Sequence, residues 1–120
     1  MIEHGPEIFQ GEVWWADLGQ PRGAVAGYRR PVVVIQGNGL NQSRIETVVC
    51  IPLTSNLKWG ALATNLLLPA TTTGLPHDSV AQPTNIQSVD KKHFIDRAGK
   101  ISPRRMEQLF ARLDLALGRN

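Results

Sequence analysis

The chain has 120 residues, which fits one domain and leaves little room for a second. Hydrophobic residues make up 42% and charged residues 19%, a globular balance that argues against a disordered chain. No apolar run approaches the roughly 20 residues of a membrane helix, and no signal peptide is visible. We therefore expect a cytoplasmic location and no membrane partner.

The net charge of +3 is mild, but the charges are unevenly distributed. Residues 1–17 carry four acidic side chains and no lysine or arginine, whereas residues 18–77 carry five basic side chains against one acid. Such a section can present a positive face to phosphates, although a solvated surface would have the same composition.

The first half of the chain predicts strands separated by long loops. Residues 1–10 are interpreted as a flexible lead-in to a single domain over residues 11–118. A strand is predicted over 12–18, then a glycine- and proline-rich loop over 19–30. Pro31 is expected to open a buried strand over 32–36, because proline is tolerated at a first strand position. A turn over 37–44 and a strand over 45–53 follow, and Cys50 in that strand is expected to be a buried hydrophobe.

The second half predicts shorter strands over 64–68, 78–82 and 84–90, with a threonine-rich loop over 70–76. One helix closes the chain, with Ser102 as N-cap and Pro103 at its first position. Its apolar stripe is expected to pack on the core and consists of Met106, Leu109, Phe110, Leu113 and Leu117. Strands without βαβ alternation predict a small, mainly β barrel with a C-terminal α-helix.

Two places carry side chains suited to phosphate chemistry. Arg30 precedes a proline, which restricts its backbone to extended geometry, and its guanidinium matches two phosphate oxygens. It could instead brace the loop by donating to carbonyls. Thr54 and Ser55 end a strand before Asn56, where their hydroxyls could form a turn or donate to a phosphate.

The sequence lacks the patterns of other chemistries. It has no Cys-x-x-Cys pair, no histidine cluster and no phosphate-binding loop, so neither a metal nor a cofactor is expected. His4, His77 and His93 are interpreted as surface histidines, although His77 could also lie near a site.

Several segments, in order, resemble the MazF/PemK family of toxins. Gly11–Leu18 (GEVWWADL) is similar to the opening strand of that family, Arg30–Ile35 to its Arg-Pro-apolar strand, and Val49–Ser55 to its strand that ends in threonine. Asp78–Val80, Ile86–Asp90 and the closing helix are similar to later segments, so the resemblance covers residues 11 to about 117.

The resemblance implies an SH3-like barrel of the CcdB/PemK type, a homodimer, and a cognate MazE-like antitoxin. It also implies metal-independent, sequence-specific cleavage of single-stranded RNA such as mRNA, with a cyclic phosphate and a 5′-hydroxyl as products. Arg30 and Thr54 match the catalytic pair of the family. The further residues expected to bind RNA are Tyr28, Arg29, Ser55, Asn56, Gln82 and Thr84. The last two could read bases, or could only cover the solvent face of a strand.

This chain also departs from the family. Gly23-Ala24-Val25 stands where many relatives carry a glutamate, and Gln82 and Thr84 stand where some carry arginine and aspartate. No general base is expected from these positions. Two alternatives therefore stay open: a CcdB-like toxin that binds and poisons DNA gyrase, and an RNA-binding barrel without catalysis.

Overall fold

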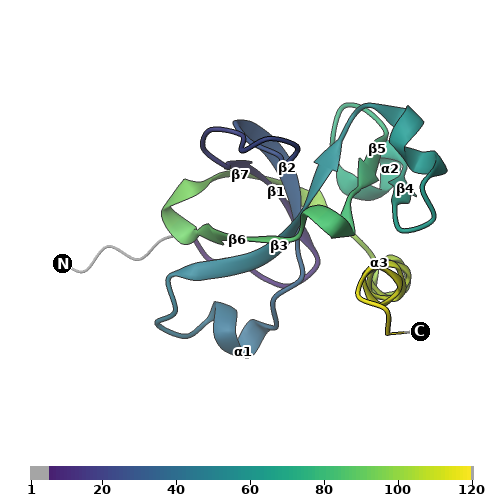
Figure 1. The fold of residues 1–120 in the computed structure, drawn as a ribbon. Coiled ribbons are helices and arrows are strands. Elements are labelled where there is room, and N and C mark those ends of the chain that lie inside the picture. Colours follow the sequence, from purple (N-terminus) through teal and green to yellow (C-terminus); the bar gives the residue numbers. More distant parts are fainter. Residues whose placement is uncertain (1–5, 120) are drawn as a thin grey trace.

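The computed structural model describes residues 6–119 (Figure 1). Their strands are β1 (Glu12–Asp17), β2 (Arg29–Val34), β3 (Thr47–Thr54), β4 (Leu66–Leu68), β5 (Ser79–Ala81), β6 (Gln87–Asp90) and β7 (Phe94–Lys100). The α-helices are α1 (Asn38–Asn41), α2 (Ala70–Thr73) and α3 (Pro103–Ala116), and the 3₁₀ helices are η1 (Leu57–Ala61), η2 (Pro83–Asn85) and η3 (Lys91–His93). The prediction of a mainly β protein with a C-terminal helix is confirmed.

The strands form one antiparallel sheet in the order β4-β5-β3-β2-β1-β7, and β6 also pairs with β3. Register shifts in the β1–β7 pairing, on either side of Trp14 and Trp15, mark irregularities of the kind that bend a strand. The sheet curls into a half-barrel of β1, β2, β3, β6 and β7, with β4, β5 and α2 to one side (Figure 1). β3 is central, because it pairs with β2, β5 and β6.

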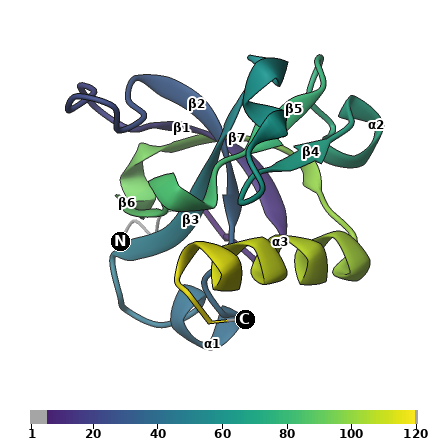
Figure 2. The same ribbon diagram turned by 45° about the vertical axis from the view of Figure 1, so that its right-hand side comes forward.

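Both faces of β2 are buried over Val32–Val34, which explains why this part of the strand is continuously apolar. Val32 and Val34 point into the curl, where they meet Trp14, Cys50 and Phe94. The residues on the opposite face join a second cluster that α3 covers; it includes Val33, Ile35, Ile51, Leu53, Met106 and Leu109. Helix α3 lies across this second cluster, below β3, β4 and β5 (Figure 2).

Helix α3 begins as predicted. The Ser102 hydroxyl accepts a hydrogen bond from the Arg105 N–H at 3.2 Å, and Pro103 occupies the first helical position. Met106 and Leu109 are buried in the core, whereas Leu117, also assigned to the stripe, is 59% exposed. The stripe therefore packs as predicted over its first turns and leaves the core at its end.

The structure corrects several predicted boundaries. Pro31 is the third residue of β2 rather than its first, because the strand already pairs with β1 at Arg29 and Arg30. The turn over 37–44 and the loop over 70–76 contain the short helices α1 and α2. The predicted strands over 64–68 and 84–90 are shorter, as β4 and β6, and η2 occupies 83–85.

The lead-in over residues 1–10 differs as well. Residues 1–5, including His4, lie outside the described residues. Ile8, however, is only 1% exposed inside the curl, so the packed domain begins before Gly11. Strand β7 was not predicted at all. No helix within residues 6–119 is long and apolar enough to cross a membrane.

Candidate active site

The candidate site lies where β2 and β3 stop pairing. Their ladder joins Val34 to Cys50, Val33 to Ile51 and Val32 to Pro52, and no further pair is formed. Pro31 has no N–H to donate, and β3 pairs with β5 at Leu53 and Thr54. A pocket of about 320 Å³ opens at this end of the two strands, within the range of about 300–1,000 Å³ typical of ligand sites.

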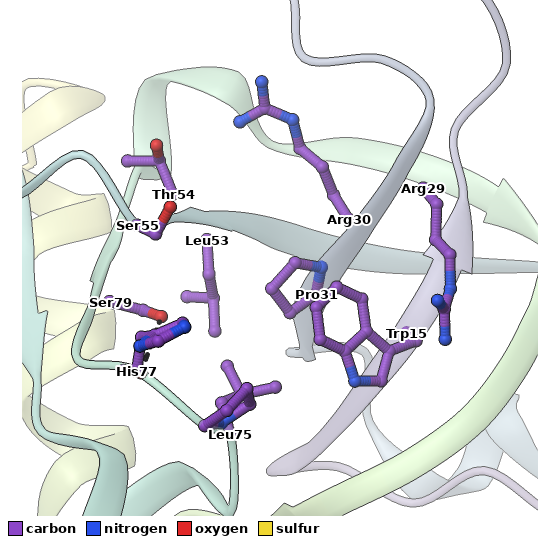
Figure 3. Close-up of a pocket in the computed structure, with 11 residues that line it drawn as sticks. Trp15, Arg29, Arg30, Pro31, Leu53, Thr54, Ser55, Leu75, His77 and Ser79 are labelled. Carbon is purple, nitrogen blue, oxygen red and sulfur yellow. Dashed lines mark hydrogen bonds between the residues drawn. The ribbon is translucent and has the colours of Figure 1, made fainter.

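Four segments line this pocket (Figure 3). Strand β1 contributes Trp15, and β2 contributes Arg29, Arg30 and Pro31. The end of β3 and the residue after it contribute Leu53, Thr54 and Ser55. The segment that leads into β5, with the first residue of β5, contributes Leu75, Pro76, His77 and Ser79. The pocket therefore combines two arginines, three hydroxyls and one imidazole with an apolar floor.

Arg30 and Thr54 lie at the same end of the pocket (Figure 3). The last pair of the β2–β3 ladder joins Val32 to Pro52, and Arg30 and Thr54 each lie two residues beyond that pair, at the same end of the two strands. Arg30 is half-buried, and its Nε donates to the Gly27 carbonyl at 3.4 Å. Within residues 6–119, no carboxylate pairs with Arg30, so its terminal amino groups are available to an anion. Arg30 can therefore brace the loop through its Nε and still bind a ligand with its terminal amino groups.

The Thr54 hydroxyl also combines two roles. Its Oγ1 accepts a hydrogen bond from the Asn56 N–H at 3.2 Å, which is the side-chain turn considered from the sequence. A hydroxyl that accepts one bond still has its own proton to donate. The turn therefore holds Thr54 in place and leaves its O–H for a ligand.

Arg29 points away from Arg30, because adjacent residues of a strand face opposite sides. Its guanidinium lies 4.8 Å from the centre of the Trp15 ring and 3.7 Å from Asp96, in an ion pair whose two side chains are 57% and 69% exposed. Exposed pairs of this kind contribute about 0–1 kcal/mol, so Asp96 orients Arg29 more than it stabilises the fold. Arg29 remains a cation on the pocket wall.

Four of the residues predicted to bind RNA do not line the pocket: Tyr28, Asn56, Gln82 and Thr84. Tyr28 is 66% exposed, and its φ of 58° is a left-handed conformation that few side chains other than glycine adopt. Gln82 and Thr84 flank or lie in η2, where Thr84 is exposed. Their role in RNA binding stays a prediction.

Sequence reasoning missed Trp15 and left His77 as a surface histidine. His77 is indeed exposed, but it also lines the pocket. The pairing of β5 with β3 brings it there, since Thr54 pairs with Val80. The residues around His77 in the sequence give no indication of this contact.

The acid–base side chains of the pocket are few. Its lining holds no aspartate or glutamate, and the departure at Ala24 and Val25 lies in an exposed loop that does not line it. Cys50 lies in the core, as expected, and burial raises the pKa of its thiol to about 12. Among residues 6–119, no three side chains of His, Cys, Asp or Glu gather as a metal site would need.

The fold and pocket define a small curled β-sheet protein with a pocket that two arginines and three hydroxyl groups line. Residues 9–117 match the model of the PemK-like, MazF-like toxins of type II toxin–antitoxin systems, and the chain belongs to this family. Endoribonuclease MazF6 of Mycobacterium tuberculosis (strain ATCC 25618 / H37Rv) is 43% identical over 102 residues, which cover 85% of this chain and 90% of that protein. Endoribonuclease MazF9 of the same strain is 33% identical over 112 residues, 90% of this chain and 94% of that protein.

Solved structures share the fold. MazF from Deinococcus radiodurans superposes with a TM-score of 0.78 at 20% identity, covering 97% of this chain and 99% of that one. An endoribonuclease from Mycobacterial species, solved in complex with its cognate antitoxin, superposes with a TM-score of 0.72 at 22% identity, covering 95% and 96%. The resemblance inferred from the sequence is therefore confirmed.

Proposed function

We propose that this chain is the toxin of a type II toxin–antitoxin pair and cleaves single-stranded RNA at short sequences without a metal. The observation that carries the proposal is that Arg30 and Thr54 line one open pocket, at the end where β2 and β3 stop pairing. The relatives at 43% and 33% identity, both named endoribonucleases, support it.

The two side chains suit phosphoryl chemistry. When the ribose 2′-hydroxyl attacks the adjacent phosphate, negative charge grows on the phosphoryl oxygens. Arg30 supplies a fixed positive charge to those oxygens, and the Thr54 hydroxyl donates a hydrogen bond to them. Donors already in place stabilise the transition state more than the ground state, and losing one costs roughly a hundred- to a thousandfold in rate. The products are a cyclic phosphate and a 5′-hydroxyl.

The proposed partners follow from the same site. A MazE-like antitoxin is supported by the structural neighbour solved with its cognate antitoxin. An acidic tail of such a partner would find Arg29 and Arg30 on the pocket wall, and would then compete with RNA for them. A homodimer, implied by the family resemblance, belongs to the proposal as well. Competition between a tail peptide and an RNA oligonucleotide tests the shared site; simultaneous independent binding contradicts it.

The central test incubates purified protein with long single-stranded RNA in excess EDTA and maps the cut ends. Arg30→Ala and Thr54→Ala are each expected to lower the cleavage rate at least a hundredfold. Arg44→Ala and Thr47→Ala are the matched controls, because both residues are exposed and lie outside the pocket. Absence of cleavage by the unmodified protein refutes the function, and equal cleavage by the site variants refutes the mechanism.

The same experiment separates the alternatives. The family match and the named endoribonuclease relatives do not favour a CcdB-like gyrase poison. Gyrase inhibition without RNA cleavage would support it. RNA binding without cleavage would support the inactive barrel.

A further inference from the structure

We propose that His77 is the general base of the reaction and accepts the proton of the attacking 2′-hydroxyl, an inference that rests on the proposed ribonuclease function. Attack by the 2′-hydroxyl needs a group that accepts its proton, and the residues that line the pocket include no carboxylate. His77 carries the one imidazole of the lining, and histidine is the side chain that most often serves as a general base.

His77 lines the same pocket as Arg30 and Thr54. It lies on the wall formed by the segment before β5, together with Ser79, while Arg30 lies on the β2 wall and Thr54 at the end of β3 (Figure 3). A scissile phosphate at Arg30 and Thr54 would therefore have its neighbouring ribose within the same 320 Å³ pocket. The imidazole is exposed, so an RNA strand can reach it without a rearrangement of the core.

The loop that carries His77 is braced by its own hydrogen bonds. The Ala70 N–H donates to Asp78 Oδ1 at 2.8 Å, and the Leu75 N–H donates to Thr73 Oγ1 at 3.1 Å. The buried Ser79 hydroxyl donates to the His77 carbonyl at 3.4 Å. Only the last of these bonds involves His77, through its backbone carbonyl, so none of the three occupies the imidazole.

A contact between two glycines anchors this loop to the sheet. A Cβ on Gly74 would lie 2.2 Å from the Ala98 carbonyl oxygen, and one on Gly99 would lie 2.4 Å from the Thr73 carbonyl oxygen. The backbone after α2 therefore rests directly on the backbone of β7. A general base must be held within hydrogen-bond reach of its proton, and this anchoring supplies such a fixed position.

The neutral His77 imidazole takes the proton of the 2′-hydroxyl as the 2′-oxygen forms a bond to phosphorus. The bond from phosphorus to the 5′-oxygen breaks, and its electron pair stays on that oxygen, which takes a proton from water. The imidazolium then returns its proton to solvent. The charged groups around His77 are Arg29 and Arg30, which line the same pocket, and Asp78, which follows it in the chain.

The test measures single-turnover cleavage of a short RNA that contains the mapped cut site, between pH 5 and 8.5. His77→Gln is expected to lower the rate constant about a hundredfold or more. The rise of the rate with pH, expected for a base in the wild type, should be lost in this variant. His93→Gln, an exposed histidine in η3 outside the pocket, is the matched control and should cleave at the wild-type rate.

Two further experiments distinguish a catalytic role of His77 from a structural one, and a general base from a general acid. Free imidazole should restore cleavage by His77→Ala, which a positioning role would not allow. With RNA in which sulfur replaces the 5′-oxygen leaving atom, the loss in His77→Gln should persist, because a thiolate leaves without a proton.

Cleavage by His77→Gln within twofold of wild type would overturn the role of His77 and leave the proposed function standing. So would a loss that imidazole does not rescue and that keeps the wild-type pH profile. A loss that disappears with the sulfur substrate would make His77 an acid and overturn its assignment as base. If the wild type cuts no RNA, both proposals fail together.

Discussion

Replacing Glu12 with alanine should destabilise the protein strongly, because Glu12 is only 6% exposed and both oxygens of its carboxylate accept hydrogen bonds. Its Oε1 accepts the Phe9 N–H at 2.7 Å and the Trp14 Nε1–H at 3.1 Å, and its Oε2 accepts the Arg97 Nε–H at 2.6 Å. Glu12→Ala removes the acceptor of the first two donors, of which the indole of Trp14 is buried. The unsatisfied indole costs about 1–3 kcal/mol and the lost hydrogen bond from the half-exposed Arg97 costs about 1–2 kcal/mol, so we expect a loss of about 2–5 kcal/mol in the free energy of unfolding.

Urea unfolding followed by tryptophan fluorescence and circular dichroism measures this loss. At roughly 4 °C per kcal/mol for a domain of this size, the melting midpoint should fall by about 8–20 °C. Glu46→Ala, at an exposed site, is the control and should stay within about 0.5 kcal/mol of wild type. Glu12→Gln keeps an oxygen acceptor and should lose less than Glu12→Ala. A loss below about 0.5 kcal/mol in Glu12→Ala would refute the claim that these donors depend on Glu12.

Three further predictions concern stability and reactivity. At Gly74, φ is +80° and an added Cβ would lie 2.2 Å from backbone, so Gly74→Ala should lower the free energy of unfolding by at least about 1–2 kcal/mol in chemical denaturation. Gly39→Ala in α1 is the control, because its Cβ would meet open space. It should leave the free energy of unfolding unchanged or raise it by up to about 1 kcal/mol. Ser102→Ala removes the cap of α3 and should cost about 1 kcal/mol by the same measurement; an unchanged midpoint would contradict the capping role. Because burial raises the pKa of Cys50 to about 12, its thiol should react with a disulfide reagent at pH 8 only after unfolding, and rapid labelling of the native protein would disprove this. The unfolded chain releases this proton near pH 8.5 and the folded chain does not, so the contribution of Cys50 to stability should fall as pH rises from about 9 towards 12.

The elements predicted correctly are those whose residue pattern shows which of their side chains are buried. The run Val32–Ile35 reads as a strand because both of its faces are buried, and α3 reads as a helix because Ser102, Pro103 and the apolar spacing agree. Strand β7 has no such signal. It carries Asp96, Arg97 and Lys100, and only Phe94 in it is buried. It forms because the free edge of β1 offers it backbone partners, which a pattern of side chains does not record.

Some residues of the candidate site could likewise be predicted from the sequence, and others could not. Arg30 and Thr54 could be predicted because each lies in a segment that resembles the family, at a strand end. Trp15 and His77 could not, because their place in the pocket depends on the curl of the sheet and on the pairing of β5 with β3. The pocket is assembled from residues 15 to 79, and only tertiary structure brings its walls together.

Because the backbone at Gly74 contacts the backbone of Ala98 and Gly99, the wall that carries His77 depends on β7 for its support. Strand β7 follows β2, β3 and this wall in the chain. A chain that ends before residues 94–100 therefore contains β2 and β3 but lacks the support of the wall that carries His77. The complete pocket requires β7, although no residue of β7 lines it.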